Sequence, residues 1–179
     1  MPFQPLVTPR LRLRLLESAD APALSAYRSD PEVARYQSWS TPFSAEQAQA
    51  LIQEMQARDL GDEGWTQIAV ADLATNTLLG DIGFRHFEPS HSELGFTLAT
   101  QQQGKGIMRE ALETLLGFTF SSLSLHRVIA NTDARNTASQ GLLTRLGFRL
   151  EGVLVESWCE DGAWFDEHLY GLLRREWKA

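Results

Sequence analysis

The segment Gln101-Gln102-Gln103-Gly104-Lys105-Gly106-Ile107 decides the fold, because it joins a predicted strand to the clearest helical pattern of the chain. Residues 93–99 fit a strand, and residues 107–120 carry apolar side chains at helical spacing. The two glycines let the backbone approach a ligand without an intervening side chain. Their amides and the unpaired N–H groups of the first helical turn form a potential anion site, to which Lys105 adds positive charge. An isolated Gly-x-Gly is also compatible with a plain tight turn.

The spacing of this loop excludes two familiar phosphate-binding motifs. A dinucleotide fingerprint needs a third glycine three residues after Gly106, where this chain has Arg109. A nucleoside-triphosphate loop needs the lysine after the second glycine, whereas Lys105 precedes it. The pattern that remains is Q-x-x-G-x-G, formed by Gln101, Gly104 and Gly106.

The flanking sequence predicts an α/β or α+β domain with a mixed sheet, because strands and helices follow one another in no single alternation. Predicted strands lie at residues 11–15, 66–72, 78–87, 127–132, 149–158 and 164–173. Predicted helices lie at residues 18–28, near Val33, from Ser44 to near Gly61, and at 137–146. The pair Asp161-Gly162 predicts a hairpin between the last two strands.

The composition excludes several classes of protein. Hydrophobic residues make up 43% and charged residues 22% of the 179 residues, so we expect one globular domain spanning residues 1–179. The net charge of −7 disfavours a nucleic-acid partner. No apolar run reaches the about 18 residues of a membrane helix, and the first residues lack a signal-peptide pattern. The single cysteine, Cys159, can form neither an intrachain disulfide nor a zinc cage, which favours a cytoplasmic protein without a metal.

Further motifs surround the glycine loop in a fixed order. They are residues 8–14 (TPRLRLR), 29–36 (SDPEVARY), 131–139 (N-x-x-x-x-N-x-x-S), 145–148 (RLGF), 151–152 (EG) and 169–177 (LYGLLRREW). Together with Q-x-x-G-x-G, they resemble the GNAT superfamily of acetyl-CoA-dependent N-acetyltransferases, and within it the RimJ/RimL branch. The resemblance covers residues 8–177. Members of that branch acetylate N-terminal amines of ribosomal proteins, and relatives acetylate amino acids, polyamines, antibiotics and other small amines.

The resemblance implies a GNAT-like acyl-CoA N-acyltransferase fold, with a splayed central sheet flanked by helices. The splay is expected where the strand ending near Ala99 meets the strand around Val128. Acetyl-CoA would be the co-substrate, its diphosphate would sit on the glycine loop, and no metal is needed. The residues expected to contact CoA are Phe96, Leu98, Gln101, Gln103, Gly104, Lys105, Gly106, Ile107, Asn131, Asn136 and Ser139.

Two residues are candidates for catalysis. Glu93 stands where the family places its general base, and a carboxylate on a polar strand face can polarise a water that takes the amine proton. His91 on the same face is an alternative base, and Glu93 is also compatible with a solvated surface residue paired with an arginine. Ser139 is suited to donate a hydrogen bond to the departing thiolate, since a hydroxyl is too weak an acid to remain an alkoxide. Ser139 is also compatible with a helix serine that makes local backbone bonds, and Asn136 is suited to cap that helix as well as to contact the pantetheine arm.

The sequence departs from the family pattern at two positions. Leu143 stands where many members carry the tyrosine that protonates the thiolate, and Gln103 stands where the branch often has an aromatic residue. The first departure leaves room for a protein that senses acetyl-CoA or CoA without turnover. Tyr36 and Trp39 are expected to border the acceptor site, the other tryptophans to lie mostly in the core. A homodimer is a possible assembly.

Overall fold

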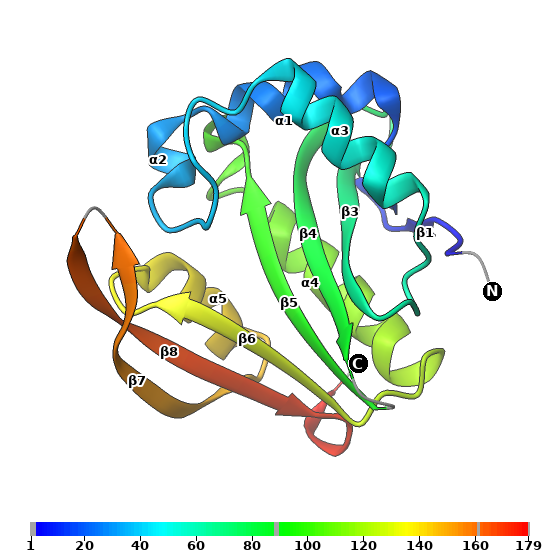
Figure 1. Ribbon diagram of the computed structural model, residues 1–179. Helices are drawn as coiled ribbons and strands as arrows, with labels where there is room; N and C mark the ends of the chain where they lie inside the picture. Colours follow the sequence, from blue (N-terminus) through cyan, green and yellow to red (C-terminus); the bar gives the residue numbers. More distant parts are fainter. Residues whose placement is uncertain (1–2, 88–89, 161, 179) are drawn as a thin grey trace.

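The computed structural model describes residues 3–87, 90–160 and 162–178. Its strands form one mixed sheet in the order β1-β2-β3-β4-β5-β6-β8-β7, and helices cover both faces (Figure 1). The strands are β1 (Leu6–Val7), β2 (Leu11–Leu15), β3 (Gly64–Asp72), β4 (Leu78–Phe87), β5 (His91–Leu98), β6 (Arg127–Asp133), β7 (Arg149–Glu160) and β8 (Ala163–Leu173). The helices are α1 (Ala21–Arg28), α2 (Pro31–Ala34), α3 (Ala45–Gln56), α4 (Ile107–Ser121) and α5 (Thr137–Arg145). The predicted mixed sheet is confirmed.

Local sequence signals set several of these boundaries. The Ser44 hydroxyl accepts a hydrogen bond from the Gln47 N–H at the start of α3, which completes the predicted capping box. At the end of α5, Gly147 has φ +90° and the Phe148 N–H donates to the Leu143 carbonyl. This is a glycine C-cap, as the sequence predicted.

The sheet splays between β5 and β6. These parallel strands pair only from His91 to Glu93 on β5 and from Arg127 to Ile129 on β6. β5 stays paired with β4 as far as Leu98, and β6 stays paired with β8 as far as Asp133. The carboxyl-terminal halves of β5 and β6 therefore diverge (Figure 1), and the predicted splay is confirmed.

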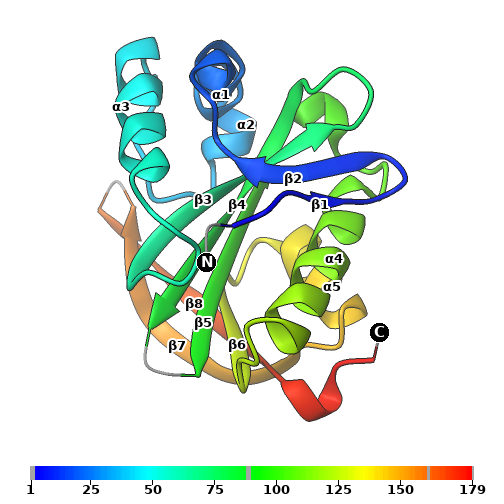
Figure 2. The same ribbon diagram turned by 90° about the vertical axis from the view of Figure 1, so that its right-hand side faces the viewer.

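Two hydrophobic clusters lie on opposite faces of the sheet. Helices α1 and α3 cover one face, and α4 and α5 cover the other (Figure 2). The larger cluster contains Leu94, Val128 and the buried stripe of α4, so these strand residues point to the α4/α5 face. Because strand side chains alternate, Glu93 and Ile129 point to the α1/α3 face.

Some expectations from the sequence were wrong. Helix α3 ends at Gln56 and not near Gly61, because Met55 in its last turn packs into the smaller cluster whereas Leu60 is buried in the larger cluster on the opposite face of the sheet. The short strand β1 was not predicted. The tryptophans do not fill the core: Trp65 and Trp164 are exposed, at 38% and 60%. The β7–β8 hairpin is confirmed by the pairing of Glu160 with Ala163, although Asp161 lies outside the described residues.

Candidate functional site

The glycine loop reaches α4 through two left-handed residues. A short 3-10 turn spans Thr100–Gln102, and Gly104 and Gly106 follow with φ of +72° and +73°. Gly106 is the N-cap of α4. Because side chains with a Cβ rarely adopt this conformation, both glycines are needed for the shape of the loop.

The loop offers a row of free hydrogen-bond donors. In the described part of the chain, the backbone N–H groups of residues 104–109 donate to no backbone or side-chain acceptor. They stand at the N-terminus of α4, where the helix dipole also favours negative charge. Lys105 does not point into this site: its Nζ lies 3.1 Å from Gln102 Oε1. The candidate anion site therefore consists of backbone donors.

A cleft of about 650 Å³ runs from this loop along the carboxyl-terminal end of β5 to α5. Eight of the residues predicted to contact CoA line it: Phe96, Leu98, Gln103, Gly104, Gly106, Ile107, Asn136 and Ser139. Gln101, Lys105 and Asn131 do not line it. Asn131 is exposed and, two residues after Ile129 on β6, shares the α1/α3 face with Glu93.

Asn136 and Ser139 together start α5 at the edge of the cleft. Asn136 is the N-cap, and its Oδ1 accepts a hydrogen bond from the Ser139 N–H at 3.1 Å. The half-buried Ser139 lines the cleft, and its hydroxyl takes part in no hydrogen bond with the described residues. The hydroxyl is therefore available to a ligand, unlike that of Thr144, which bonds the helix backbone.

Glu93 is the last β5 residue paired with β6, so it stands where the strands part. Its side chain is 15% exposed, and its Oε2 accepts a hydrogen bond from Arg85 Nη1 at 3.2 Å. Burial raises the pKa of Glu93 above its ordinary value, Arg85 opposes that shift, and the charge of Glu167 adds to it. Glu93 is thus a stronger base than a free glutamate.

His91, the alternative base, lies two residues further from the opening of the splay. Its ring stands 6.2 Å from the rings of Phe87 and His126, and its Nδ1 lies 3.4 Å from Ser90 Oγ. These contacts hold His91 where β5 and β6 are still paired, away from the opening.

Leu143 provides no acid at the position where many family members carry tyrosine. It is 1% exposed and belongs to the larger hydrophobic cluster. Its neighbour Leu142 lines the cleft instead.

The cleft also contains residues that the sequence analysis did not assign. Thr97, Met108, Arg109 and Arg145 line it, as do four residues of α2 and the segment after it: Glu32, Val33, Arg35 and Gln37. Helical spacing could have predicted the lining residues from α5, because residues 138, 139, 142 and 145 share one face of that helix.

Tyr36 was expected at the acceptor site and does line the cleft. Trp39 was expected there too, but its ring covers the Arg28 guanidinium at 4.3 Å, and its Nε1–H donates to the Arg28 carbonyl.

The described residues form neither a metal-binding cluster nor a membrane-spanning helix. They include no group of three or more histidine, cysteine, aspartate or glutamate side chains arranged to hold a metal ion. No helix formed by them is both long enough and apolar enough to cross a membrane.

Comparison with known proteins identifies the family. A family model described as an acetyltransferase (GNAT) domain matches residues 10–149, which is most of the chain. The chain belongs to the GNAT family of acetyltransferases. GNAT acetyltransferases use acetyl-CoA, and a cleft that starts at a row of free N–H groups fits a co-substrate with a diphosphate.

Relatives of this GNAT chain are bacterial N-acetyltransferases. An uncharacterized N-acetyltransferase, p20, of Bacillus licheniformis is 36% identical over 98% of this chain and 99% of its own length. The [ribosomal protein uS5]-alanine N-acetyltransferase of Escherichia coli is 37% identical over 84 residues, 47% of this chain and 43% of that enzyme. The crystal structure of a GNAT acetyltransferase from Bacillus anthracis superposes with a TM-score of 0.88 at 26% identity, over 97% of this chain and all of the other.

Proposed function

We propose that this GNAT acetyltransferase transfers the acetyl group of acetyl-CoA to the N-terminal α-amine of a protein, by direct attack in a ternary complex. One observation carries the proposal. Glu93, with a raised pKa, stands at the point where β5 and β6 part, on the face opposite α4 and its row of free N–H groups. An amine on the α1/α3 face and a thioester in the cleft would meet at this opening.

The diphosphate of CoA would bind the N–H groups of residues 104–109, and the pantetheine arm would enter the splay between β5 and β6. There the unpaired backbone edge of β5 beyond Glu93 can bond its amides in the manner of an added strand. Phe96 and Leu98 would contact the arm from β5, and Asn136 and Ser139 from α5.

In the reaction, the amine nitrogen attacks the thioester carbon, and the carbon–sulfur bond then breaks. The new bond is the amide, the proton of the amine passes to Glu93 directly or through a water, and the electron pair leaves with sulfur. The free Ser139 hydroxyl would donate a hydrogen bond to the thiolate, which also lies near the N-terminus of α5.

An α-amine is favoured over a lysine as the acceptor because less free energy is needed to remove its proton at pH 7. An N-terminal amine has a pKa of about 7.8 and a lysine about 10.4, so loss of the proton at pH 7 costs about 1.1 and 4.6 kcal/mol respectively. The acceptor proposal also rests on the Escherichia coli relative, which is named as an N-acetyltransferase of alanine in ribosomal protein uS5.

The test is release of free CoA from acetyl-CoA with a panel of acceptors, followed by mass spectrometry of the product. The panel should contain peptides that begin with alanine or serine, the same peptides with a blocked N-terminus and one internal lysine, free amino acids and spermidine. We expect acetylation of the free N-termini. Acetylation of spermidine or amino acids alone would place the acceptor among small amines. Binding of acetyl-CoA without thiol release for any acceptor would favour a sensor.

The assembly is proposed to be a homodimer formed through β7. This twelve-residue strand ends the sheet and exposes apolar side chains, among them Val155 at 73%. A long apolar edge strand favours pairing with another chain. Light scattering should give twice the chain mass, and Val155→Lys should shift it to that of one chain. A cytoplasmic location stays a prediction.

A further inference from the structure

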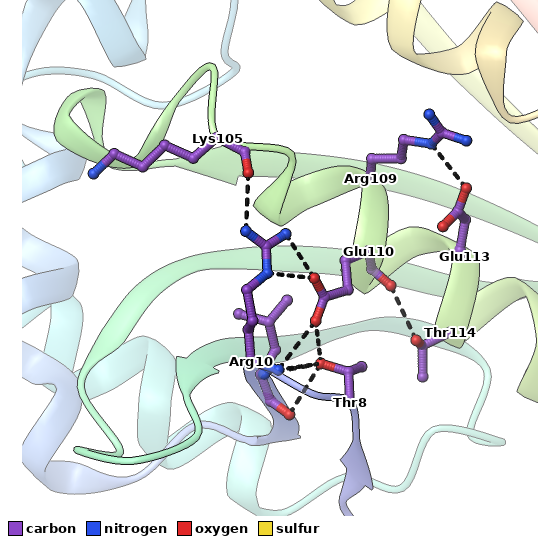
Figure 3. Close-up of polar contacts among 8 residues, drawn as sticks. Thr8, Arg10, Lys105, Arg109, Glu110, Glu113 and Thr114 are labelled. Carbon is purple, nitrogen blue, oxygen red and sulfur yellow. Dashed lines mark hydrogen bonds and ion pairs between the residues drawn. The ribbon is translucent and has the colours of Figure 1, made fainter.

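The glycine loop contacts a residue close to the N-terminus of the chain. Arg10, just before β2, lies beside the first turn of α4 (Figure 3). Its Nε donates to Glu110 Oε2 at 2.6 Å, and its Nη1 donates to the Lys105 carbonyl at 3.1 Å. Thr8 Oγ1 donates to the other oxygen of Glu110 at 2.5 Å. One arginine thus joins a helix carboxylate to a carbonyl of the loop.

The bond to the Lys105 carbonyl fixes the orientation of a peptide plane. In a trans peptide the C=O and the following N–H point in opposite directions. Because the Lys105 carbonyl is turned toward Arg10, the N–H of Gly106 is turned away from it. The N–H of Arg109 is free as well, because Arg109 lies in the first turn of α4, where the N–H groups have no partner within the helix.

Arg10 lies on the other side of the loop from the main cleft. It lines a separate hollow of about 360 Å³ with Lys105, Gln102 and Ile107, and it is absent from the lining of the main cleft. A Cβ placed on Gly106 would be 3.7 Å from Arg10 Nη2. The guanidinium therefore contacts the loop on the side that faces away from the main cleft.

Glu110 keeps this support in place. Although burial acts to raise its pKa, the hydrogen bonds from Thr8 and Arg10 hold the pKa of Glu110 below its ordinary value. Its carboxylate is ionised at neutral pH and would repel a nearby diphosphate if Arg10 did not neutralise it.

We propose that Arg10, held by Glu110 and Thr8, is a positioning residue for co-substrate binding: it turns the Lys105–Gly106 peptide so that the loop amides converge on the diphosphate of CoA. This function does not depend on which amine is acetylated. It concerns only the part of acetyl-CoA that carries the diphosphate, and it gives the TPRLRLR segment a role at the site.

The test compares Arg10→Gln with Arg12→Gln, a matched change at the next arginine of the segment. Loss of hydrogen bonds made by a charged group should weaken CoA binding by about tenfold or more in Arg10→Gln, measured by calorimetry. The kcat at saturating acetyl-CoA should be unchanged, so the effect falls on KM. With acetyl-pantetheine, which lacks the diphosphate, kcat/KM should match that of the wild type. Arg12→Gln should bind CoA normally.

Glu110→Gln separates positioning from a direct charge effect. If Arg10 acts through the loop, Glu110→Gln loosens it and also weakens CoA binding, by less than Arg10→Gln. If Arg10 acted as a free positive charge on the phosphates, removing the carboxylate would tighten binding, which would overturn the proposal. Equal losses with acetyl-CoA and acetyl-pantetheine, or normal CoA binding by Arg10→Gln, would overturn it too. Thermal unfolding of each variant checks that half-exposed Arg10 is not needed for folding.

Discussion

Replacing Glu93 by glutamine removes the carboxylate from the point where β5 and β6 part, and we expect it to slow acetyl transfer without weakening acetyl-CoA binding. Glu93 does not line the cleft that starts at the glycine loop. Its side chain is held by Arg85 on the neighbouring strand, on the face opposite α4. The change should therefore act on the amine and leave the co-substrate untouched.

The size of the effect follows from the pKa difference between the two groups. The α-ammonium has a pKa of about 7.8, and burial raises the pKa of Glu93 above its ordinary 4.5. Moving the proton from the α-ammonium to Glu93 is then unfavourable by less than about 3.3 pKa units, which corresponds to about 4.5 kcal/mol. A general base in this range accelerates a reaction by about 10²-fold, so kcat/KM at pH 7 should fall by about that factor.

Thiol release measured from pH 6 to pH 9 is the assay. The loss in Glu93→Gln should shrink as the pH rises, because more acceptor is already neutral. Glu113→Gln, on the exposed face of α4, is the control and should be as active as the wild type. Full activity of Glu93→Gln across this range would show that Glu93 is not the base, and His91 or an ordered water would take its place.

The raised pKa of Glu93 also sets the sign of two pH effects. Wild-type activity should fall on acidification through a pKa above 4.5, and Arg85→Gln should move that fall to higher pH, because Arg85 lowers the pKa of Glu93. A carboxyl with a raised folded-state pKa stabilises the fold only while protonated, and this contribution is lost as pH rises through the folded pKa. Glu93→Gln should consequently not lower the melting temperature at pH 7.

Three further changes test other parts of the site, and a fourth tests a buried ion pair. Ser139→Ala should lower kcat less than Glu93→Gln does, and raising the pH should not restore the rate, since the hydroxyl acts on sulfur. Gly104→Val places a branched side chain at φ +72°, where strain of about 1–3 kcal/mol should weaken CoA binding in calorimetry. Lys105→Ala should cost at most about 1 kcal/mol of binding, and equally mild effects of the two would argue against the loop as the phosphate site. Asp81→Ala removes the ion-pair partner of the buried Arg28, 2.8 Å away, and should lower the free energy of unfolding in urea by about 3–5 kcal/mol. A loss under 1 kcal/mol would contradict a structural role for this pair.

The sequence predicted those elements whose apolar period reflects burial on one face. Helix α4 was found within a residue of its bounds, because it has a regular apolar stripe that packs on the sheet. Strand β4 was found at its bounds, although its first seven residues are all buried. The end of α3 was misplaced because Leu60 continues the apolar pattern but packs into the other cluster. Periodicity cannot show which face a buried residue joins.

At the site, the sequence predicted residues that lie in local motifs and missed those brought in by tertiary contact. The glycine loop and the start of α5 were recognised from their own residues. The contact between Arg10 and Glu110 joins positions 100 apart, and Glu32 reaches the cleft from α2. Such contacts depend on how the sheet places α2, β2 and α4, which no local pattern contains.

The absence of a tyrosine at position 143 is a modest obstacle to catalysis. A thiol has a pKa of about 8.5, so a thiolate released at pH 7 lies only about 2 kcal/mol above the protonated form. A hydrogen bond from Ser139 and the N-terminus of α5 are of the right size to offset this. Leu143→Tyr should then fail to raise kcat, and because Leu143 is 1% exposed in the core, the larger side chain should cost about 1–3 kcal/mol of stability in urea unfolding. A stable Leu143→Tyr variant with a higher kcat would show instead that protonation of sulfur limits the enzyme and that the core can turn this side chain into the cleft.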